Sequence, residues 1–149
     1  MAADLKALIR YSKWGVDEKR RVLADLQRRE DAILAEQRAL EEEILAEQRL
    51  VATSAVEVSA GFAYGGFAIR CLQRREQLSA ALENARALVA QAQDELAEAF
   101  RELKTYEISQ ANRERREREE MERREQVDQD EISLNLFRRG RIEEGGEAG

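Results

Sequence analysis

Apart from carboxylates, the sequence is poor in the side chains that do chemistry in proteins. The chain of 149 residues has no histidine and one cysteine, Cys71. A histidine base, a histidine metal site and a thiolate metal cluster are therefore excluded, and no Gly-x-x-x-x-Gly-Lys loop is present to hold a phosphate. Carboxylates catalyse proton transfer only in a dry, concave pocket. We expect no enzymatic activity, no cofactor, no metal ion and no small-molecule substrate.

A run of arginines over residues 113–126 could instead bind nucleic-acid phosphates. This run contains six Arg and six Glu, so its net charge is zero. Pairs such as Glu120 and Arg124 stand four residues apart, the spacing at which ion pairs form along a helix. A phosphate-binding helix needs an excess of positive charge on one face. We therefore expect a solvated, self-paired helix and no nucleic-acid partner, with nucleic-acid binding as the weaker alternative.

The remaining composition indicates long helices and no compact core. Charged residues make up 38% of the chain and aromatic residues 5%, and there is no proline. Abundant Ala, Glu, Arg and Leu is typical of coiled coils, and without proline nothing forces a helix to stop. We predict a first long helix over residues 1–56, a turn or tip over 57–66, a second long helix over 67–139 and a disordered tail over 140–149.

Apolar residues recur in both predicted helices at alternating steps of four and three, which places them on one helix face. The second helix has the cleaner seam, formed by Leu78, Leu82, Ala85, Val89, Ala92, Leu96, Ala99, Leu103 and Tyr106. A sustained seam needs a partner helix. The sequence therefore predicts an all-α fold, a long antiparallel two-helix coiled coil or helical hairpin with a protruding C-terminal helix end.

The position of the turn sets how the two helices align, because heptad frames coincide again after each shift by one heptad. With the reversal centred on Gly61, the expected facing pairs are Ile44 with Leu78, Leu40 with Leu82, Ile33 with Val89, Leu26 with Leu96 and Val16 with Tyr106. The structural alternative is a parallel homodimer in which the central stretch is a mere interruption of the helix.

Gly15 interrupts the first predicted helix and follows Trp14, the one tryptophan of the chain. A glycine inside a helix costs about 1 kcal/mol relative to alanine. We expect the helix to continue through Gly15 and Trp14 to pack against the second helix, because packing usually overrides propensity. A deliberate break of the helix at this point is the alternative.

The sequence favours a cytoplasmic protein. Residues 51–69 contain one charge, Glu57, but they are too rich in Ala, Ser, Thr and Gly for a membrane span, which normally needs about 20 predominantly apolar residues. The N-terminus lacks the apolar core of a signal peptide, and a single cysteine cannot form a disulfide within the chain.

Three stretches carry a resemblance to a known family. They are residues 62–69 (Phe-Ala-Tyr-Gly-Gly-Phe-Ala-Ile), residues 102–114 and residues 130–139 (Asp-Glu-Ile-Ser-Leu-Asn-Leu-Phe-Arg-Arg). With two long helices and this length, the chain resembles FliJ-type flagellar export proteins over nearly its whole length. The resemblance implies an antiparallel coiled coil similar to the central stalk of rotary ATPases, and no enzymatic activity of its own.

The resemblance also implies partners and a place in the cell. The partners would be the export ATPase ring, whose assembly and activity the family promotes, a membrane export-gate component and export chaperones. The protein would be cytoplasmic and peripheral at the cytoplasmic side of the inner membrane, held there only through these partners. A generic coiled-coil structural protein that forms a parallel homodimer is the alternative.

Two groups of residues are the candidate binding sites. Carried onto this sequence, the tip patch of the family falls on Phe67 and, one turn later, on Cys71 or Leu72, with Tyr64 beside it. The end that carries both termini would face the ATPase ring. Near that end, the apolar residues 127–137, which include Leu134 and Phe137, either dock onto a partner or form a last helical turn that Gly140 ends.

Overall fold

The computed structural model describes residues 2–53 and 58–147, and all of these residues are helical. The first helix, α1, spans Ala2–Thr53, and the second helix, α2, spans Val58–Glu147. Side chains are described for residues 4–53 and 64–146. No strand occurs in this part of the chain, and the two helices contact each other, so the predicted all-α helical hairpin is confirmed.

Local interactions explain why both helices are long. Ala, Leu, Glu, Gln and Arg have high helix propensity, and no proline interrupts them. Asp4 lies in the first turn of α1, where a carboxylate interacts favourably with the helix dipole. At the other end of α1, the Thr53 hydroxyl lies 3.2 Å from the carbonyl oxygen of Leu50, to which it donates a hydrogen bond. This carbonyl belongs to the last turn, whose acceptors have no partner within the helix backbone.

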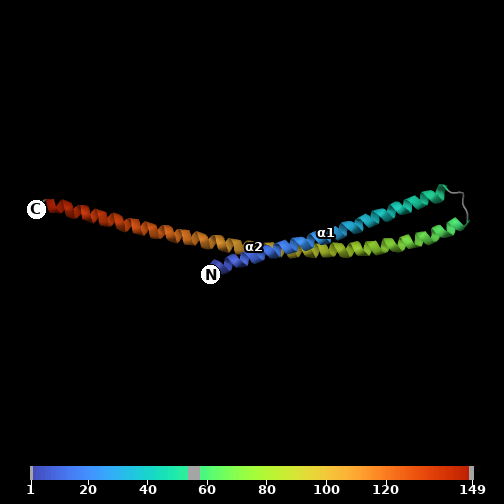
Figure 1. Cartoon of the computed structure of the whole chain (residues 1–149), viewed down its shortest axis with the longest axis horizontal. Helices are drawn as coiled ribbons and strands as arrows, with labels where there is room; N and C mark the ends of the chain where they lie inside the picture. Colours follow the sequence, from blue (N-terminus) through green and yellow to red (C-terminus); the bar gives the residue numbers. More distant parts are fainter. Residues whose placement is uncertain (1, 54–57, 148–149) are drawn as a thin grey trace. The chain divides into compact units, whose positions relative to one another are not determined.

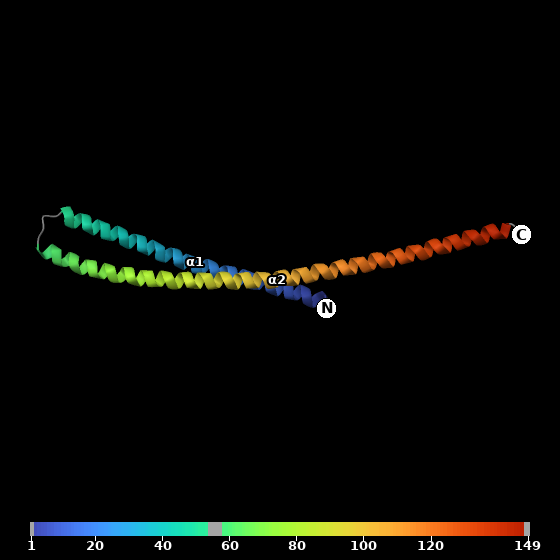
Figure 2. The same ribbon diagram turned by 180° about the vertical axis from the view of Figure 1, so that it is seen from behind.

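The contacts of the chain divide it into two compact units, residues 10–103 and residues 1–9 with 104–149, and each is described by itself. In the first unit α1 and α2 lie side by side in opposite directions (Figure 1). Figure 2 shows the same pairing from behind. Four ion pairs join the helices at distances of 2.6–3.3 Å, namely Lys19–Glu95, Glu30–Arg86, Glu36–Arg74 and Glu41–Arg75. Lys19 and Glu30, earlier in α1, pair with residues later in α2 than the partners of Glu36 and Glu41, so the helices are antiparallel.

The core of this unit is a seam of small and medium apolar residues. Leu40, Cys71 and Leu78 form a buried cluster, against which Ile33, Ile44 and Phe67 pack. Further along the seam, Val16, Ala85, Val89, Ala92 and Leu103 are also buried. The buried residues of α2 after Cys71 all belong to the predicted four-three frame, and Cys71 continues that frame by one heptad.

The alignment of the two helices differs from the predicted one. Leu40 packs with Cys71 and Leu78, whereas its predicted partner was Leu82. The predicted alignment also places Arg75 opposite Glu47, but Arg75 binds Glu41, more than one helical turn away. A shift of close to one heptad keeps seam against seam, which is why apolar spacing alone did not fix the alignment.

The observed ends of the helices correct the predicted turn and tail. Gly61, Gly65 and Gly66 were assigned to a turn over 57–66, but all three lie inside α2. Among the described residues no glycine has a positive φ, the conformation in which glycine reverses a chain. The helix α1 ends at Thr53 and α2 begins at Val58, and residues 54–57 lie outside the described residues. At the other end, α2 continues through Gly140 to Glu147, although a disordered tail was expected over 140–149.

The prediction for Gly15 is confirmed and the one for Trp14 is wrong. The helix α1 continues through Gly15 without a break. Trp14 does not pack against α2, because 60% of its surface is exposed. Val16, two residues later, is buried in the seam. Residues two apart on a helix point to nearly opposite sides, so burial of Val16 directs Trp14 outward.

A candidate membrane span was also weighed for residues 51–69. Within the residues that the structure describes, neither helix contains a segment apolar and long enough to cross a bilayer.

Leu78 is the most deeply buried leucine of the seam, and we predict that Leu78→Ala lowers the free energy of unfolding by about 2–4 kcal/mol, because a cavity remains beside Leu40. Urea unfolding followed by circular dichroism measures this loss. Leu72→Ala on the same helix is the matched control. Leu72 is exposed, so its change should stay within about 0.5 kcal/mol. Equal losses from the two variants would contradict the described seam.

The Glu41–Arg75 ion pair predicts a pH dependence. Arg75 donates two hydrogen bonds of 2.6 Å to the Glu41 carboxylate, and this lowers the pKa of Glu41 below its ordinary value. A lowered pKa in the folded state means that the pair stabilises the hairpin above the ordinary carboxyl pKa, and that this contribution is lost as the pH falls through the lowered value. Arg75→Gln should return the pKa of Glu41 toward its ordinary value, as measured by carboxyl NMR titration. Arg74→Gln is the control, because Arg74 binds Glu36 and should leave Glu41 unchanged.

Candidate functional site

The start of α2 contains the residues of the predicted tip patch, and the structure separates them into two groups. Phe67 packs against the core cluster, and Cys71 is buried within it. Tyr64 is half-buried, and its ring lies 6.3 Å from that of Phe67, centroid to centroid. Leu72, in contrast, has 56% of its surface exposed. The two aromatic residues therefore cover the end of the seam, while Leu72 faces outward.

Cys71 is thus a core residue, and its inclusion in an exposed tip patch is corrected. The seam frame that runs through Leu78 passes through Cys71 one heptad earlier, which leaves Leu72 on the outside of the helix. Ile69 is 59% exposed and lies three residues before Leu72, close to it on the helix surface. The sequence prediction missed Ile69, although extending the seam back from Leu78 would have placed it on the outer face.

The second candidate surface lies at the C-terminal end of α2. Every described side chain from Met121 to Gly146 is exposed, and we call this segment the C-terminal arm. It includes the predicted Leu134 and Phe137, and the Arg141 guanidinium lies 5.6 Å from the centre of the Phe137 ring. The expected helical end at Gly140 is absent, because α2 continues beyond it. The arm therefore exposes its apolar side chains along a continuous helix.

The apolar side chains of the arm do not form a stripe. At about 100° per residue, they point in directions spread around the whole helix. A helix that packs on one neighbour carries a single apolar stripe, whereas a helix that is apolar on all sides is normally enclosed. The seven exposed large apolar residues of the arm are Met121, Val127, Ile132, Leu134, Leu136, Phe137 and Ile142.

Charged side chains in the first part of the arm and just before it pair with one another. Glu120 binds Arg123 at 2.9 Å and Arg124 at 3.4 Å, which confirms the predicted pair with Arg124. The hydrogen bond from Arg123, followed by its positive charge, lowers the pKa of Glu120. Arg115 lies 3.9 Å from Glu119. These contacts support the expectation of a self-paired, solvated surface.

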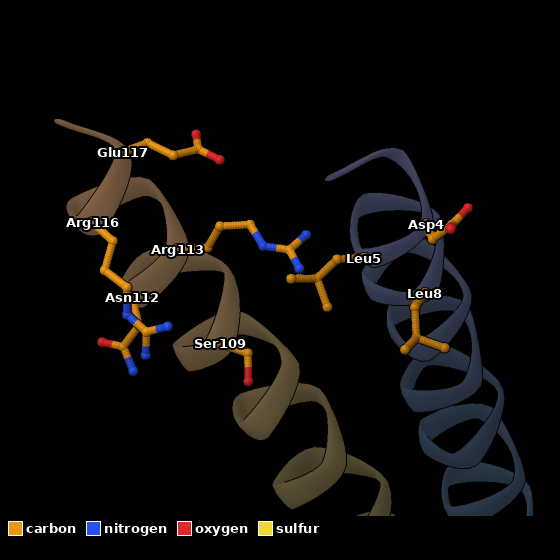
Figure 3. Close-up of a pocket in the computed structure, with 8 residues that line it drawn as sticks. All are labelled: Asp4, Leu5, Leu8, Ser109, Asn112, Arg113, Arg116 and Glu117. Carbon is orange, nitrogen blue, oxygen red and sulfur yellow. The ribbon is translucent and has the colours of Figure 1, made fainter. Parts of the chain in front are cut away.

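A shallow groove lies between the first turns of α1 and residues 109–117 of α2, both in the second unit (Figure 3). Leu5 and Leu8 form its apolar side, and the Arg113 side chain points across it toward Leu5. The sequence prediction did not identify this groove. Its polar side arises because the seam frame of α2 turns polar beyond Tyr106. The groove is lined by Asp4, Leu5, Leu8, Ser109, Asn112, Arg113, Arg116 and Glu117.

We next asked whether the described residues include a group that could act as a metal site or as a catalytic carboxylate. Among the described residues, no group of three or more His, Cys, Asp or Glu side chains could hold a metal ion. The carboxylates with shifted pKa values, Glu41, Glu95 and Glu120, lie on the surface and are shifted downward by hydrogen bonds from Arg or Lys. Structural ion pairs account for these shifts.

Residues 1–141 match the family described as Flagellar FliJ protein, a range that includes α1 and nearly all of α2. The comparisons with curated proteins and with solved structures returned no match.

Substitutions at Gly65 test whether α2 is helical at this position. A methyl group added at Gly65 would meet no atom within 4 Å, so Gly65→Ala should raise the free energy of unfolding by up to about 1 kcal/mol through helix propensity. Gly65→Pro should lower it by about 3 kcal/mol, because proline removes a helical hydrogen bond. Thermal unfolding followed by circular dichroism measures both. Destabilisation by alanine together with tolerance of proline would indicate the turn that the sequence predicted.

Proposed function

This chain belongs to the FliJ family, a structural component of flagellar export, and from that premise we propose that it is a non-enzymatic stalk and adapter of the flagellar type III export apparatus. It promotes assembly and activity of the export ATPase ring with its C-terminal arm. The start of α2 contacts the membrane export gate and export chaperones. These partners hold it at the cytoplasmic side of the inner membrane.

The observation that carries this proposal is the distribution of apolar groups on the C-terminal arm. Side chains such as Leu134, Leu136 and Phe137 are each more than half exposed and point in different directions. One partner helix would cover only a stripe and leave the others in water. A ring that surrounds the arm can cover all of them, so an enclosing partner fits this distribution better than a neighbouring helix.

The balanced charges near the arm support the same function. Arg115–Glu119 and Glu120–Arg123 neutralise each other along the helix. A surface of this kind keeps an exposed helix in solution without a large field of one sign that would attract nucleic acid. The segment can therefore approach a protein ring without strong nonspecific adhesion.

Near the start of α2, the outer face of the helix offers Ile69 and Leu72 to a partner, while Phe67 packs against the core on the other side. Exposed aliphatic side chains are suited to a small interface, in which a few residues supply most of the binding energy. Charged neighbours Arg74 and Arg75 are engaged with α1. We assign the gate and chaperone contacts to this face, and Cys71 to the core.

We predict that the purified chain raises the turnover of the cognate export ATPase, and that the double variant Leu134→Ser, Phe137→Ser loses this effect. Removal of two anchor side chains from an enclosed helix should weaken binding by at least about tenfold. The measurement is phosphate release at increasing concentrations of the chain. Leu72→Ser is the matched control. It should keep the stimulation while weakening binding of the gate component.

Circular dichroism checks that the double variant remains helical, as expected for exposed positions. If the intact chain changes neither the rate nor the oligomeric state of the ATPase, the proposed function is refuted. Stimulation that survives the double variant would show that the arm is not the contact.

A further inference from the structure

An exposed aromatic pair lies on α1, on the side facing away from the seam. Tyr11 and Trp14 have 70% and 60% of their surface exposed, and their ring centroids are 6.3 Å apart. Val22 is also exposed and lies eleven residues after Tyr11, which returns it to the same face after about three turns. Trp and Tyr are the residues most enriched among binding anchors. Neither belongs to the C-terminal arm or to the start of α2.

Gly15 lies within this face, and nothing in its own unit requires a glycine there. A methyl group added at Gly15 would meet no atom within 4 Å. Alanine would stabilise the helix by about 1 kcal/mol, so the glycine carries a cost without an internal benefit. An absent side chain next to Trp14 leaves a notch on the surface. Such a notch lets the backbone of another molecule approach closely.

Uncompensated positive charge surrounds the aromatic pair. Arg10 and Lys13 are exposed and make no ion pair with any other described residue, and no acidic residue lies between them and Val16. The next charged residues along α1 are paired within the helix, Asp17 with Arg20 at 3.8 Å and Glu18 with Arg21 at 2.9 Å. The face therefore attracts a partner with negative charge.

The positive charge of Arg10 and Lys13 helps to choose among three possible binding partners for this face: a second copy of the chain, an anionic lipid surface and an acidic helix. A second copy of the chain would bring two further cations against Arg10 and Lys13, which disfavours self-association through this face. An anionic lipid surface would also attract the cations, but a lipid has no backbone to lie against the notch at Gly15. A helix with acidic side chains satisfies both the charge and the notch.

We propose that the face of α1 around Tyr11 and Trp14, with Arg10 and Lys13 on one side and Gly15 on the other, binds an acidic helical segment of a partner protein. The backbone of that segment lies against Gly15, and its apolar side chains contact the rings of Tyr11 and Trp14. Its carboxylates pair with Arg10, on the other side of Trp14 from Gly15, and Lys13 adds positive charge on that same side. The inference rests on the proposed function in one respect, namely that the export ATPase supplies this segment.

The experiment measures binding of the cognate export ATPase to the intact chain and to three variants. Trp14→Ala, Gly15→Leu and the double variant Arg10→Glu, Lys13→Glu should each weaken binding at least about tenfold. Gly15→Leu is the most discriminating, because leucine raises helix propensity and should increase thermal stability while it blocks close approach. Arg38→Glu with Arg49→Glu, the same charge change at exposed positions elsewhere on α1, should bind within about twofold of the intact chain.

A photo-crosslinker in place of Trp14 identifies the occupant. The expected product joins position 14 to an ATPase peptide rich in Asp and Glu. A crosslink to a second copy of the chain would overturn the proposal in favour of self-association. A blue shift of Trp14 fluorescence with phosphatidylglycerol vesicles, without a crosslink to the ATPase, would overturn it in favour of a lipid surface.

Two failures can be told apart. If the intact chain binds and stimulates the ATPase but the three variants match it, this inference alone is wrong. If the intact chain neither binds nor stimulates the ATPase, the proposed function fails and the inference fails with it.

Discussion

The fold depends on one constraint, that two helices can bury only the line along which they touch. Among the described side chains none is completely enclosed, and the core consists of leucine, valine, alanine and one cysteine along a seam. Each residue contributes modestly, so stability accumulates along the length of the contact. The ion pairs on both flanks, such as Glu30–Arg86 and Glu41–Arg75, fix one alignment among several that the seam alone would allow. All other surface is left for partners.

Spacing of apolar residues was sufficient to predict the helices and the seam from Leu78 to Leu103, because period and burial are linked directly in a coiled coil. The alignment could not be predicted in the same way, because a seam with a heptad repeat matches itself after each heptad. The prediction of a turn over residues 57–66 relied on its glycines and was wrong. Gly61 and Gly65 lower the helix propensity of this stretch, but both lie inside α2. The cost of about 1 kcal/mol for each glycine is small enough for the rest of a long helix to offset.

The candidate surfaces were predictable only where exposure follows from the seam. For Leu134 and Phe137 the sequence left two alternatives, docking onto a partner or a last helical turn ended by Gly140; both side chains are exposed, and the helix continues past Gly140. Cys71 was assigned to the surface through a family resemblance, although its place in the seam frame buries it. Trp14 was expected to pack because large aromatic residues usually do. Val16, two residues later, occupies the seam position, and residues two apart on a helix point to nearly opposite sides.

The scatter of apolar groups around the C-terminal arm has a mechanical meaning. A stripe such as the seam of the hairpin defines one preferred angle about the helix axis, since any rotation removes leucines from their contacts. An arm without a stripe has no preferred azimuth, and a sleeve around it would find similar apolar contacts at every angle.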